Sequence, residues 1–205
     1  MLHVKSAIVL VGGEARRVNG MEKYFFRYHG KTFIERLVES LRPVTDEIVL
    51  VAKDARQCAR FRKFEGVRCV RDIRTGIGPL GGIHAGVLAA TGDVLFVCAC
   101  DMPCVSGPVV ERLFAALDDH DAVIPVWSGE MIEPLHAVYR RSALAAYLES
   151  HESLSVRAMV KSLDAVYFSV EELRELDPDL ITFTNINKLE ELETMENRNG
   201  SSGKE

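Results

Sequence analysis

Ile8-Val9-Leu10-Val11 leads directly into Gly12-Gly13-Glu14-Ala15-Arg16-Arg17, and Lys23 follows shortly after. The apolar residues are typical of a short buried strand, and the two glycines end it in a turn where backbone N–H groups can approach a ligand closely. Cations placed just beyond such a turn can neutralise a polyphosphate. The stretch matches neither the Walker loop nor the dinucleotide fingerprint. It predicts a loop for a nucleoside triphosphate, and the alternative is an ordinary strand–loop junction with solvated cations.

On either side of this stretch, short apolar runs alternate with helical patterns, which is typical of a mostly parallel α/β sheet with right-handed crossovers. The runs are nearly continuous in apolar residues, as in strands covered on both faces. They predict strands at Ala7–Val11, Ile48–Val51, Val67–Val70, Val94–Cys98 and Ala122–Val126. A helix is predicted after Thr32, because apolar residues recur at three and four positions and Thr32 with Glu35 has the form of a capping box. Further helices are predicted at about Asp54–Lys63, Gly82–Ala90, Gly107–Leu117, Ser142–Glu149 and Ser155–Leu163.

The second half of the chain has a less regular pattern. It predicts a strand at Pro134–Tyr139, antiparallel to the others, then strands near Val166–Ser169 and at Ile181–Thr184, and a terminal helix from Lys188 to Met195. Residues 197–205 are small and polar, so we expect them to be disordered. No repeat or linker divides the rest, and we expect a single domain over residues 1–196.

The composition bounds the function classes. The 205 residues are 47% hydrophobic and 27% charged, with a formal net charge of −5, which indicates a globular protein and argues against a general nucleic-acid surface. No apolar run has membrane-spanning length and the N-terminus lacks a signal-peptide pattern, so we expect a cytoplasmic protein without a membrane partner. Cys98, Cys100 and Cys104 lie close together, but their spacing favours buried thiols over a metal site.

Two carboxylates follow predicted strands. Asp101 comes directly after the apolar run from Val94, and Pro103 prevents that strand from continuing. Asp72 follows the strand predicted at 67–70. Ligands of open α/β sheets bind beyond the carboxyl ends of the strands, and a carboxylate beside a polyphosphate suits Mg²⁺. A turn or helix-capping aspartate is the alternative at Asp101.

A glycine-rich segment runs from Arg71 to Gly82 and enters a predicted helix. Gly81 and Gly82 allow the backbone to approach a flat or bulky ligand group, and the helix N-terminus favours an anion. A flexible loop is the alternative interpretation.

Polar residues of the second half are candidates for a second substrate. Glu133 precedes the strand that holds His136, and Asn185 and Asn187 alternate after another predicted strand. His84 and His136 are the most ligand-like histidines, although a packed or hydrogen-bonded histidine is the more common case. A turn and helix cap is the alternative for the two asparagines.

Five motifs occur in order and together resemble a known family. They are Leu10-Val11-Gly12-Gly13-x-x-x-Arg17 with Lys23, Gly78-Pro79-Leu80-Gly81-Gly82, Cys100-Asp101-Met102-Pro103, Glu133-Pro134-Leu135 and Asn185-Ile186-Asn187. From about residue 5 to residue 194 the chain resembles molybdenum cofactor guanylyltransferases, which belong to the nucleotidyltransferases with a glycosyltransferase-A-like fold. The chain departs from the family pattern in having Glu22 where aspartate is usual before the lysine.

The resemblance implies a Rossmann-like sheet with helices on both faces, and transfer of GMP from GTP to the phosphate of molybdopterin with Mg²⁺ as cofactor. It implies catalytic roles for Arg17, Lys23 and Asp101, with Asp101 as the metal ligand. Residues expected at the nucleotide are Leu10, Val11, Gly12, Gly13, Lys23, Asp72, Gly81, Gly82 and Asp101. Residues expected on the pterin side are Glu133, His136, Asn185 and Asn187.

Alternatives remain within this interpretation. The same scaffold could use CTP, transfer a nucleotide to a sugar phosphate, or bind a nucleotide and carry the cofactor without turnover. Arg17, Lys23 and Asp101 occur together, which favours an enzyme, because binding alone does not need a metal ligand. Molybdoenzyme apoproteins or cofactor-insertion proteins are the expected protein partners.

Overall fold

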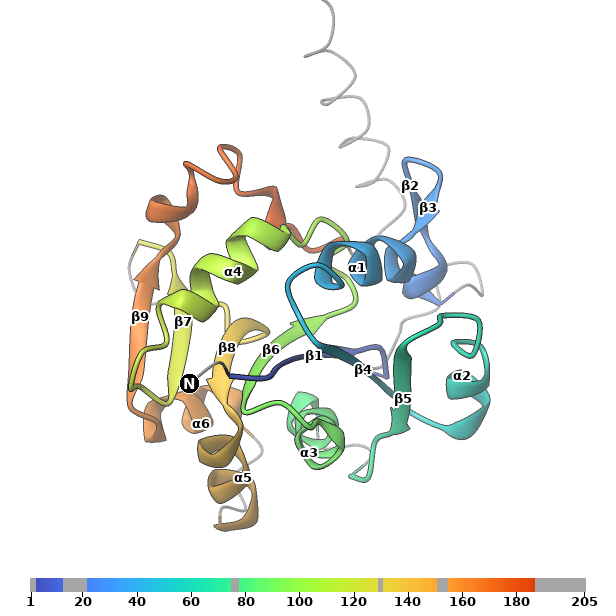
Figure 1. Ribbon diagram of the computed structural model, residues 1–205, viewed down its shortest axis with the longest axis horizontal. Helices are drawn as coiled ribbons and strands as arrows, with labels where there is room; N and C mark the ends of the chain where they lie inside the picture. The colour runs from blue at the N-terminus through green and yellow to red at the C-terminus, as the bar shows by residue number, and fades with distance from the viewer. Residues whose placement is uncertain (1–2, 13–21, 75–77, 129–130, 151–154, 187–205) are drawn as a thin grey trace, which may run out of the picture.

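The computed structural model describes residues 3–12, 22–74, 78–128, 131–150 and 155–186 (Figure 1). Gly13, Arg17 and Asn187 lie outside the described residues, as do the predicted helix at 188–195 and the tail from 197. The backbone of Lys23 is described and its side chain is not.

Seven strands form the central sheet. In spatial order they are β5 (Val67–Arg71), β4 (Glu47–Ala52), β1 (Lys5–Leu10), β6 (Val94–Ala99), β8 (His136–Arg140), β7 (Ala122–Val126) and β9 (Ala165–Ser169). β5, β4, β1 and β6 pair in parallel, and β7 pairs in parallel with β9. β8 is antiparallel to both of its neighbours, β6 and β7. The predicted mostly parallel sheet and its single antiparallel strand are therefore confirmed.

Helices cover both faces of the sheet, as predicted. α1 (Phe33–Leu41) and α4 (Gly107–Ala115) lie over one face, and α3 (Pro79–Ala89), α5 (Arg141–Ser150) and α6 (Val156–Ser162) lie over the other (Figure 1). The short helix α2 (Ala55–Ala59) flanks the edge strand β5. A small hairpin of β2 (Arg27–Tyr28) and β3 (Lys31–Thr32) and three 3₁₀ helices, η1 (Lys23–Phe25), η2 (Val170–Leu173) and η3 (Ile181–Phe183), complete the described elements.

The alternation of side chains along the strands divides the core into two layers. In β1, Ala7 and Val9 pack with α1 and α4, whereas Ile8 packs with α3 and α5 on the other face. Helix α3 approaches the sheet unusually closely, because a Cβ added to Gly86 would lie 2.5 Å from Cγ2 of Ile8. A larger residue there would have to displace a side chain in a close-packed interior.

Two predicted elements differ from the structure. The helix predicted over Asp54–Lys63 ends at Ala59, and the chain continues in turns in which the N–H of Phe61 bonds the carbonyl of Cys58. The strand predicted at Ile181–Thr184 is wrong, since this segment forms η3. Leu180 adopts a left-handed conformation with φ of 51°, and the following N–H groups bond locally, so the segment cannot extend along the sheet.

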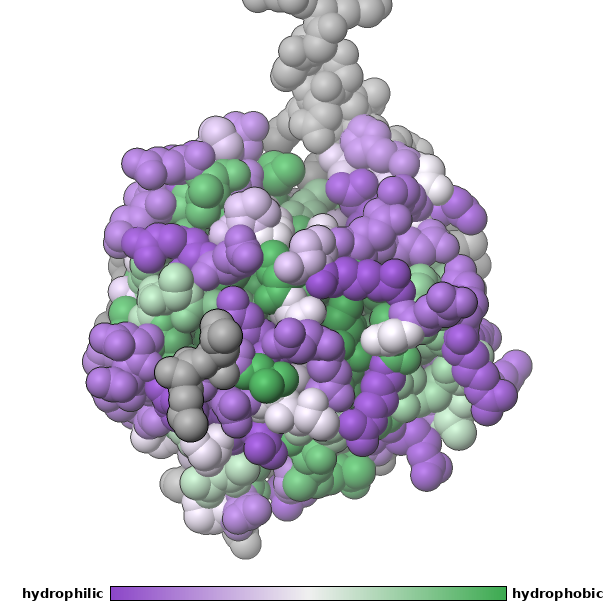
Figure 2. Space-filling view, in the orientation of Figure 1, coloured by the Kyte–Doolittle hydropathy of each residue, from purple (hydrophilic) through white to green (hydrophobic). Residues whose placement is uncertain are grey.

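Among the described residues, no helix is both long enough and apolar enough to cross a membrane. The face of the molecule in Figure 2 is largely hydrophilic, with apolar residues scattered between polar ones, as is usual for a protein surface.

The predicted capping box at the start of α1 is confirmed. Thr32 Oγ1 accepts from the N–H of Glu35 at 3.3 Å, and Glu35 Oε2 accepts from the N–H of Thr32 at 2.8 Å. Lys63 Nζ lies 3.0 Å from the other carboxylate oxygen. The bond from the Thr32 backbone and the Lys63 ammonium lower the pKa of Glu35 to about 2.

The capping box yields a prediction about acid stability. The pKa of Glu35 is about 2 in the folded protein against an ordinary 4.5, so its charge stabilises the fold at neutral pH and that contribution is lost as the pH falls from about 4.5 towards 2. We expect Glu35→Gln to unfold at a lower urea concentration at pH 7, with a loss of about 0.5–1 kcal/mol, and the gap to wild type to shrink at pH 3. Glu39→Gln, which removes an exposed carboxylate from the same helix, is the control and should change little. A gap that is the same at both pH values would contradict this assignment.

Candidate active site

The carboxyl ends of four parallel strands meet at one edge of the sheet. The register pairs Leu10 at the end of β1 with Val51 of β4 and with Ala99 of β6. Two further hydrogen bonds extend this pairing, from Val11 N to the Val51 carbonyl at 2.9 Å and from Cys100 N to the Leu10 carbonyl at 3.1 Å. The residues that follow these strands therefore lie side by side, which brings the start of the glycine turn close to Asp101.

Gly12 lies against the end of β4. A Cβ at this position would stand 2.6 Å from Lys53 N and 2.9 Å from the Ala52 carbonyl carbon. Both are backbone atoms and cannot rotate away, so only glycine fits unless the strand ends separate. The glycine predicted from the sequence is thus required by the contact of one strand end with the next.

A buried glutamine holds this contact in place. Gln57, on α2, is 2% exposed. Its Oε1 accepts from Lys53 N at 2.8 Å, and its Nε2 donates to the Val11 carbonyl at 3.3 Å. Sequence reasoning missed this residue, although Asp54 followed by Gln57 has the spacing of a helix cap, and Asp54 Oδ1 does accept from Gln57 N at 2.7 Å.

Glu22 stands out in the sequence only as a departure from the family pattern, and its structural role was missed. Its carboxylate is nearly buried, accepts hydrogen bonds from Tyr24 and Arg60, and lies 3.4 Å from Lys53 Nζ. Burial works to raise its pKa, but the Tyr24 hydroxyl and the charges of Arg60 and Lys53 outweigh it, so the pKa is lowered. Burial and the same carboxylate raise the pKa of Tyr24 to about 12. An ionised Glu22 thus ties the backbone just before Lys23 to α2 and to the end of β4.

Asp101 lies directly beyond β6 and is partly buried. Its carbonyl accepts from the N–H of Ile186 at 2.8 Å, which fixes the turn against the last described segment. Within the described residues no three His, Cys, Asp or Glu side chains gather as a metal site. A single carboxylate beside the loop predicted to bind a nucleotide would suit Mg²⁺, because that ion is commonly held by one or two carboxylates together with substrate phosphates.

The neighbouring cysteines do not form a metal site with one another. Cys98 is fully buried in β6 and Cys104 is 7% exposed, while Cys100 is partly buried. Burial, followed by the nearby Cys100 and Asp101, raises the pKa of the Cys98 thiol. Cys98 and Cys104 are therefore apolar core side chains, as the spacing predicted.

On the β5 side, Asp72 continues the ladder by donating its N–H to the Ala52 carbonyl at 2.7 Å. Its Oδ1 accepts from Arg74 N at 2.8 Å, which closes a turn after the strand. Asp72 thus lies at the same edge as Gly12 and Asp101, separated from them by the end of β4.

Helix α3 begins at this edge, and the structure corrects the reason expected for one of its glycines. A Cβ on Gly82 would meet Leu10 Cδ2 at 3.1 Å and Val51 Cγ1 at 3.7 Å. The space at Gly82 therefore accommodates the sheet and is not open to a ligand. Gly81 is buried in the same first turn.

His136 is inside the protein, which agrees with the packed alternative and not with direct contact to a substrate. It is 0% exposed, its ring packs between Phe96 and Phe183 at centroid distances of 5.1 and 4.7 Å, and its Nε2 lies 3.3 Å from Thr182 Oγ1. Burial lowers the pKa of His136 to about 3, so the ring is neutral.

Glu133 and Asn185 lie nearer the surface. Glu133 Oε1 accepts from the indole N–H of Trp127 at 2.8 Å. Burial raises the pKa of Glu133, although the hydrogen bond from Trp127 opposes the shift. Asn185 is exposed and precedes Ile186, which bonds to Asp101. Since β8 is antiparallel, its first residue lies beside the carboxyl end of β6, at the edge that carries Asp101.

Together with the comparisons with known proteins, this fold defines a nucleotidyltransferase. The MobA-like NTP transferase domain matches residues 7–166, and the chain belongs to this family.

Individual relatives agree with that assignment. The chain is 42% identical over 201 residues to a probable molybdenum cofactor guanylyltransferase of Methanosarcina acetivorans, covering 93% of this chain and 89% of the relative. It is 34% identical to a molybdenum cofactor guanylyltransferase of Desulfosudis oleivorans, covering 93% and 94%. The crystal structure of molybdopterin-guanine dinucleotide biosynthesis protein A from Archaeoglobus fulgidus superposes with a TM-score of 0.80 at 33% identity, covering 96% of this chain and 99% of the other.

The contact between strand ends yields a prediction with a matched control. Gly12→Ala puts a Cβ 2.6 Å from Lys53 N, so we expect a loss of stability of about 1–3 kcal/mol and weaker binding of a nucleoside triphosphate to the folded protein. Gly86→Ala creates a clash of the same size with Ile8, in the middle of β1. It should destabilise the protein similarly and leave nucleotide affinity unchanged. Thermal unfolding measures the loss of stability, and calorimetric titration measures nucleotide affinity. If Gly12→Ala and Gly86→Ala lost affinity equally, the contact at Gly12 would have no specific role in nucleotide binding.

Proposed function

We propose that the protein is a Mg²⁺-dependent guanylyltransferase that transfers GMP from GTP to the terminal phosphate of molybdopterin and releases pyrophosphate. The observation that carries the proposal is the position of Asp101 beside the Gly12 turn, joined through the hydrogen bond from Cys100 N to the Leu10 carbonyl. The names of its relatives, 42% and 34% identical, support the choice of substrates.

The chemistry requires positioning more than proton transfer. A phosphate oxygen of the acceptor forms the new bond to the α-phosphorus of GTP, and the bond from that phosphorus to the bridging oxygen breaks, so pyrophosphate leaves with the electron pair. The attacking phosphate is already an anion at neutral pH, and no general base is needed. Alignment of two anions and neutralisation of their charge then supply the catalysis.

Particular residues are assigned to these tasks. Asp101 would hold Mg²⁺, which when bound neutralises charge at the α-phosphate. Arg17 and Lys23 would neutralise the leaving pyrophosphate. Gly12, packed against the end of β4, would position the turn, and Gly13 would admit the phosphates close to the backbone. Leu10, Val11, Asp72 and the start of α3 would line the rest of the nucleotide.

The acceptor would bind on the β8 side of Asp101. Glu133, Asn185 and Asn187 are proposed to contact the pterin. His136 is proposed to act indirectly, because it is buried between Phe96 and Phe183 and supports the segment that carries Asn185. We also propose that the reaction takes place in the cytoplasm and that the product passes to molybdoenzyme apoproteins or insertion proteins.

The metal assignment is tested by Asp101→Asn. The substitution keeps the size of the side chain and removes its charge, so we expect kcat to fall at least about a hundredfold with the melting temperature nearly unchanged. Asp93→Asn is the control, because Asp93 is exposed at the opposite end of the same strand, and it should retain full turnover. Near-normal turnover of the Asp101→Asn variant in Mg²⁺ would show that the assignment of Asp101 as the metal ligand is wrong. Binding of GTP by the wild type without any turnover would favour a cofactor carrier.

The choice of base is tested by competition among nucleotides. Helix α3 begins at Pro79, so the N–H groups of its first turn have no acceptor within the helix. They suit the O6 acceptor of guanine and oppose the amino group of adenine or cytosine, and an unpaired polar group there costs about 1–3 kcal/mol. We expect kcat/KM for GTP to exceed that for ATP and CTP by at least about tenfold. The assay would follow labelled GTP, ATP, CTP and UTP with molybdopterin and with common sugar phosphates. Equal use of CTP would overturn the guanylyl assignment, and transfer to a sugar phosphate would overturn the acceptor.

A further inference from the structure

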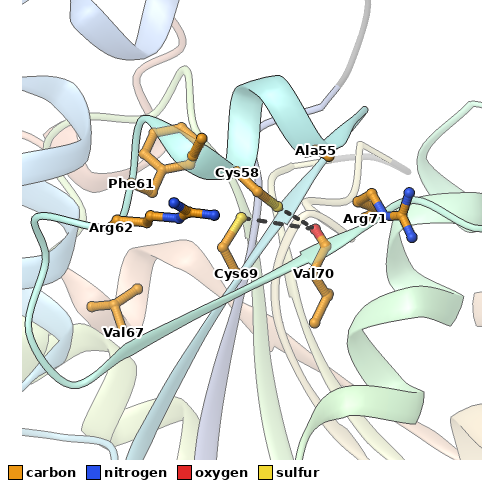
Figure 3. Close-up of a pocket in the computed structure, with 9 residues that line it drawn as sticks. Ala55, Cys58, Phe61, Arg62, Val67, Cys69, Val70 and Arg71 are labelled. Atoms are coloured by element: carbon orange, nitrogen blue, oxygen red, sulfur yellow. Dashed lines mark hydrogen bonds between the residues drawn. The ribbon is translucent and has the colours of Figure 1, made fainter.

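A cavity of about 500 Å³ opens between α2 and the edge strand β5, away from the β8 side of the sheet (Figure 3). Two cysteines from different elements meet in it, Cys58 from α2 and Cys69 from β5. Their sulfur atoms lie 3.4 and 3.9 Å from the same acceptor, the Val70 carbonyl oxygen. Figure 3 shows both thiols pointing to this oxygen, with the sulfur atoms on the same side of β5.

The cavity makes this pair accessible. Both cysteines are partly buried and line the open space, whereas Cys98 is 0% exposed and Cys104 is 7% exposed within the core. The remaining lining is apolar or cationic, with Phe61 and Val67 on one side and the guanidinium groups of Arg62 and Arg71 nearby. A small neutral molecule can therefore reach the sulfur atoms without crossing the core.

We propose that Cys58 and Cys69 are a modification site, at which hydrogen peroxide oxidises the two thiols to a disulfide that joins α2 to β5. The sulfur of one cysteine attacks a peroxide oxygen, the O–O bond breaks, and that cysteine becomes a sulfenic acid while water leaves. The sulfur of the other cysteine then attacks the first sulfur, and the sulfenic acid oxygen leaves as water. Two thiols and one hydrogen peroxide thus yield one disulfide and two waters.

The contact between the two thiols supports the second of these steps. Burial and the adjacent Cys58 thiol raise the pKa of Cys69. Because the thiolate is the attacking species, the raised pKa slows the reaction at neutral pH and the reaction becomes faster as the pH rises.

The disulfide would connect α2 and β5, and residues of α2 also bond to the ends of β1 and β4 at the candidate active site. Cys58 directly follows Gln57, which bonds to Val11 and Lys53, and Arg60 on the same turn bonds to Glu22. A link from α2 to β5 would restrict movement of the helix that carries both residues. The modification itself does not depend on the proposed guanylyl transfer, because its test reads the covalent structure.

The test is a peptide map of the full-length protein. The reduced protein is treated with hydrogen peroxide, the remaining thiols are alkylated, and the chain is cleaved without reductant by a glutamate-specific protease, which separates the two cysteines at Glu65. We expect a linked pair of peptides containing Cys58 and Cys69, lighter by two hydrogen atoms than the free peptides and released by dithiothreitol. Cys58→Ser and Cys69→Ser should each abolish the link, and Cys100→Ser should retain it.

Two outcomes would overturn the proposal. One is recovery of both cysteines as separate alkylated peptides after an exposure that oxidises free cysteine completely. The other is a product on one cysteine alone, such as a sulfinic acid on Cys58 with Cys69 still alkylated. The wild-type map decides between these results without any variant, so a folding defect in a serine variant would not obscure the answer.

Discussion

The arrangement of the site depends on the contact between the backbone of Gly12 and the backbone at the end of β4. No side chain fits at Gly12, since a Cβ would come within 2.6 Å of Lys53 N. Gln57 is buried behind this contact and bonds to both partners, to Val11 on one chain segment and to Lys53 on the other. A polar side chain this deeply buried is stable only when its hydrogen bonds are made. The turn that follows β1 therefore starts from a fixed position, which the proposed alignment of phosphates would require.

The segment next to this contact is rich in positively charged side chains. Residues 53–74, which include α2 and β5, contain eight Lys or Arg and only three Asp or Glu, in a chain whose net charge is −5. The right-hand side of the molecule in Figure 2, where α2 and β5 lie in Figure 1, is mainly hydrophilic. Such a concentration of positive charge would attract the anionic nucleotide of the proposed reaction. Glu22 pairs with Arg60 and Lys53, and Lys63 pairs with Glu35, so part of this charge is used in ion pairs within the protein.

The sequence predicted the repeating elements well and the tertiary partners poorly. Strand positions follow from apolar runs, and the capping box of Thr32 and Glu35 is a local pattern that needs no distant contact. Gln57 and Glu22 were missed because their partners lie far along the chain or depend on how α2 packs. Ile181 to Thr184 looks like a strand from its apolar residues, but the left-handed Leu180 and the bond from Thr182 N to Asp177 turn it into a 3₁₀ helix. At Gly82 the glycine in the sequence indicates that a side chain would not fit, but it does not show whether a ligand or the sheet takes up the space. In the structure the side chains of Leu10 and Val51 lie there.

The single antiparallel strand brings segments from both halves of the sheet to the edge at which the two proposed substrates would meet. In a fully parallel sheet the residues before a strand lie at the opposite edge from those after it. Because β8 runs the other way, the segment before it, which includes Glu133, reaches the carboxyl end of β6, and Ala99 N bonds to the Leu135 carbonyl there at 3.3 Å. Ile186 reaches the same place through its bond to Asp101. Asp101 therefore lies at the boundary between two parts of the sheet. One part contains the parallel strands β5, β4, β1 and β6, and the other contains the antiparallel strand β8. A metal held at this boundary would contact the phosphate that both substrates share in the transition state, which is where added charge neutralisation has the greatest effect on rate.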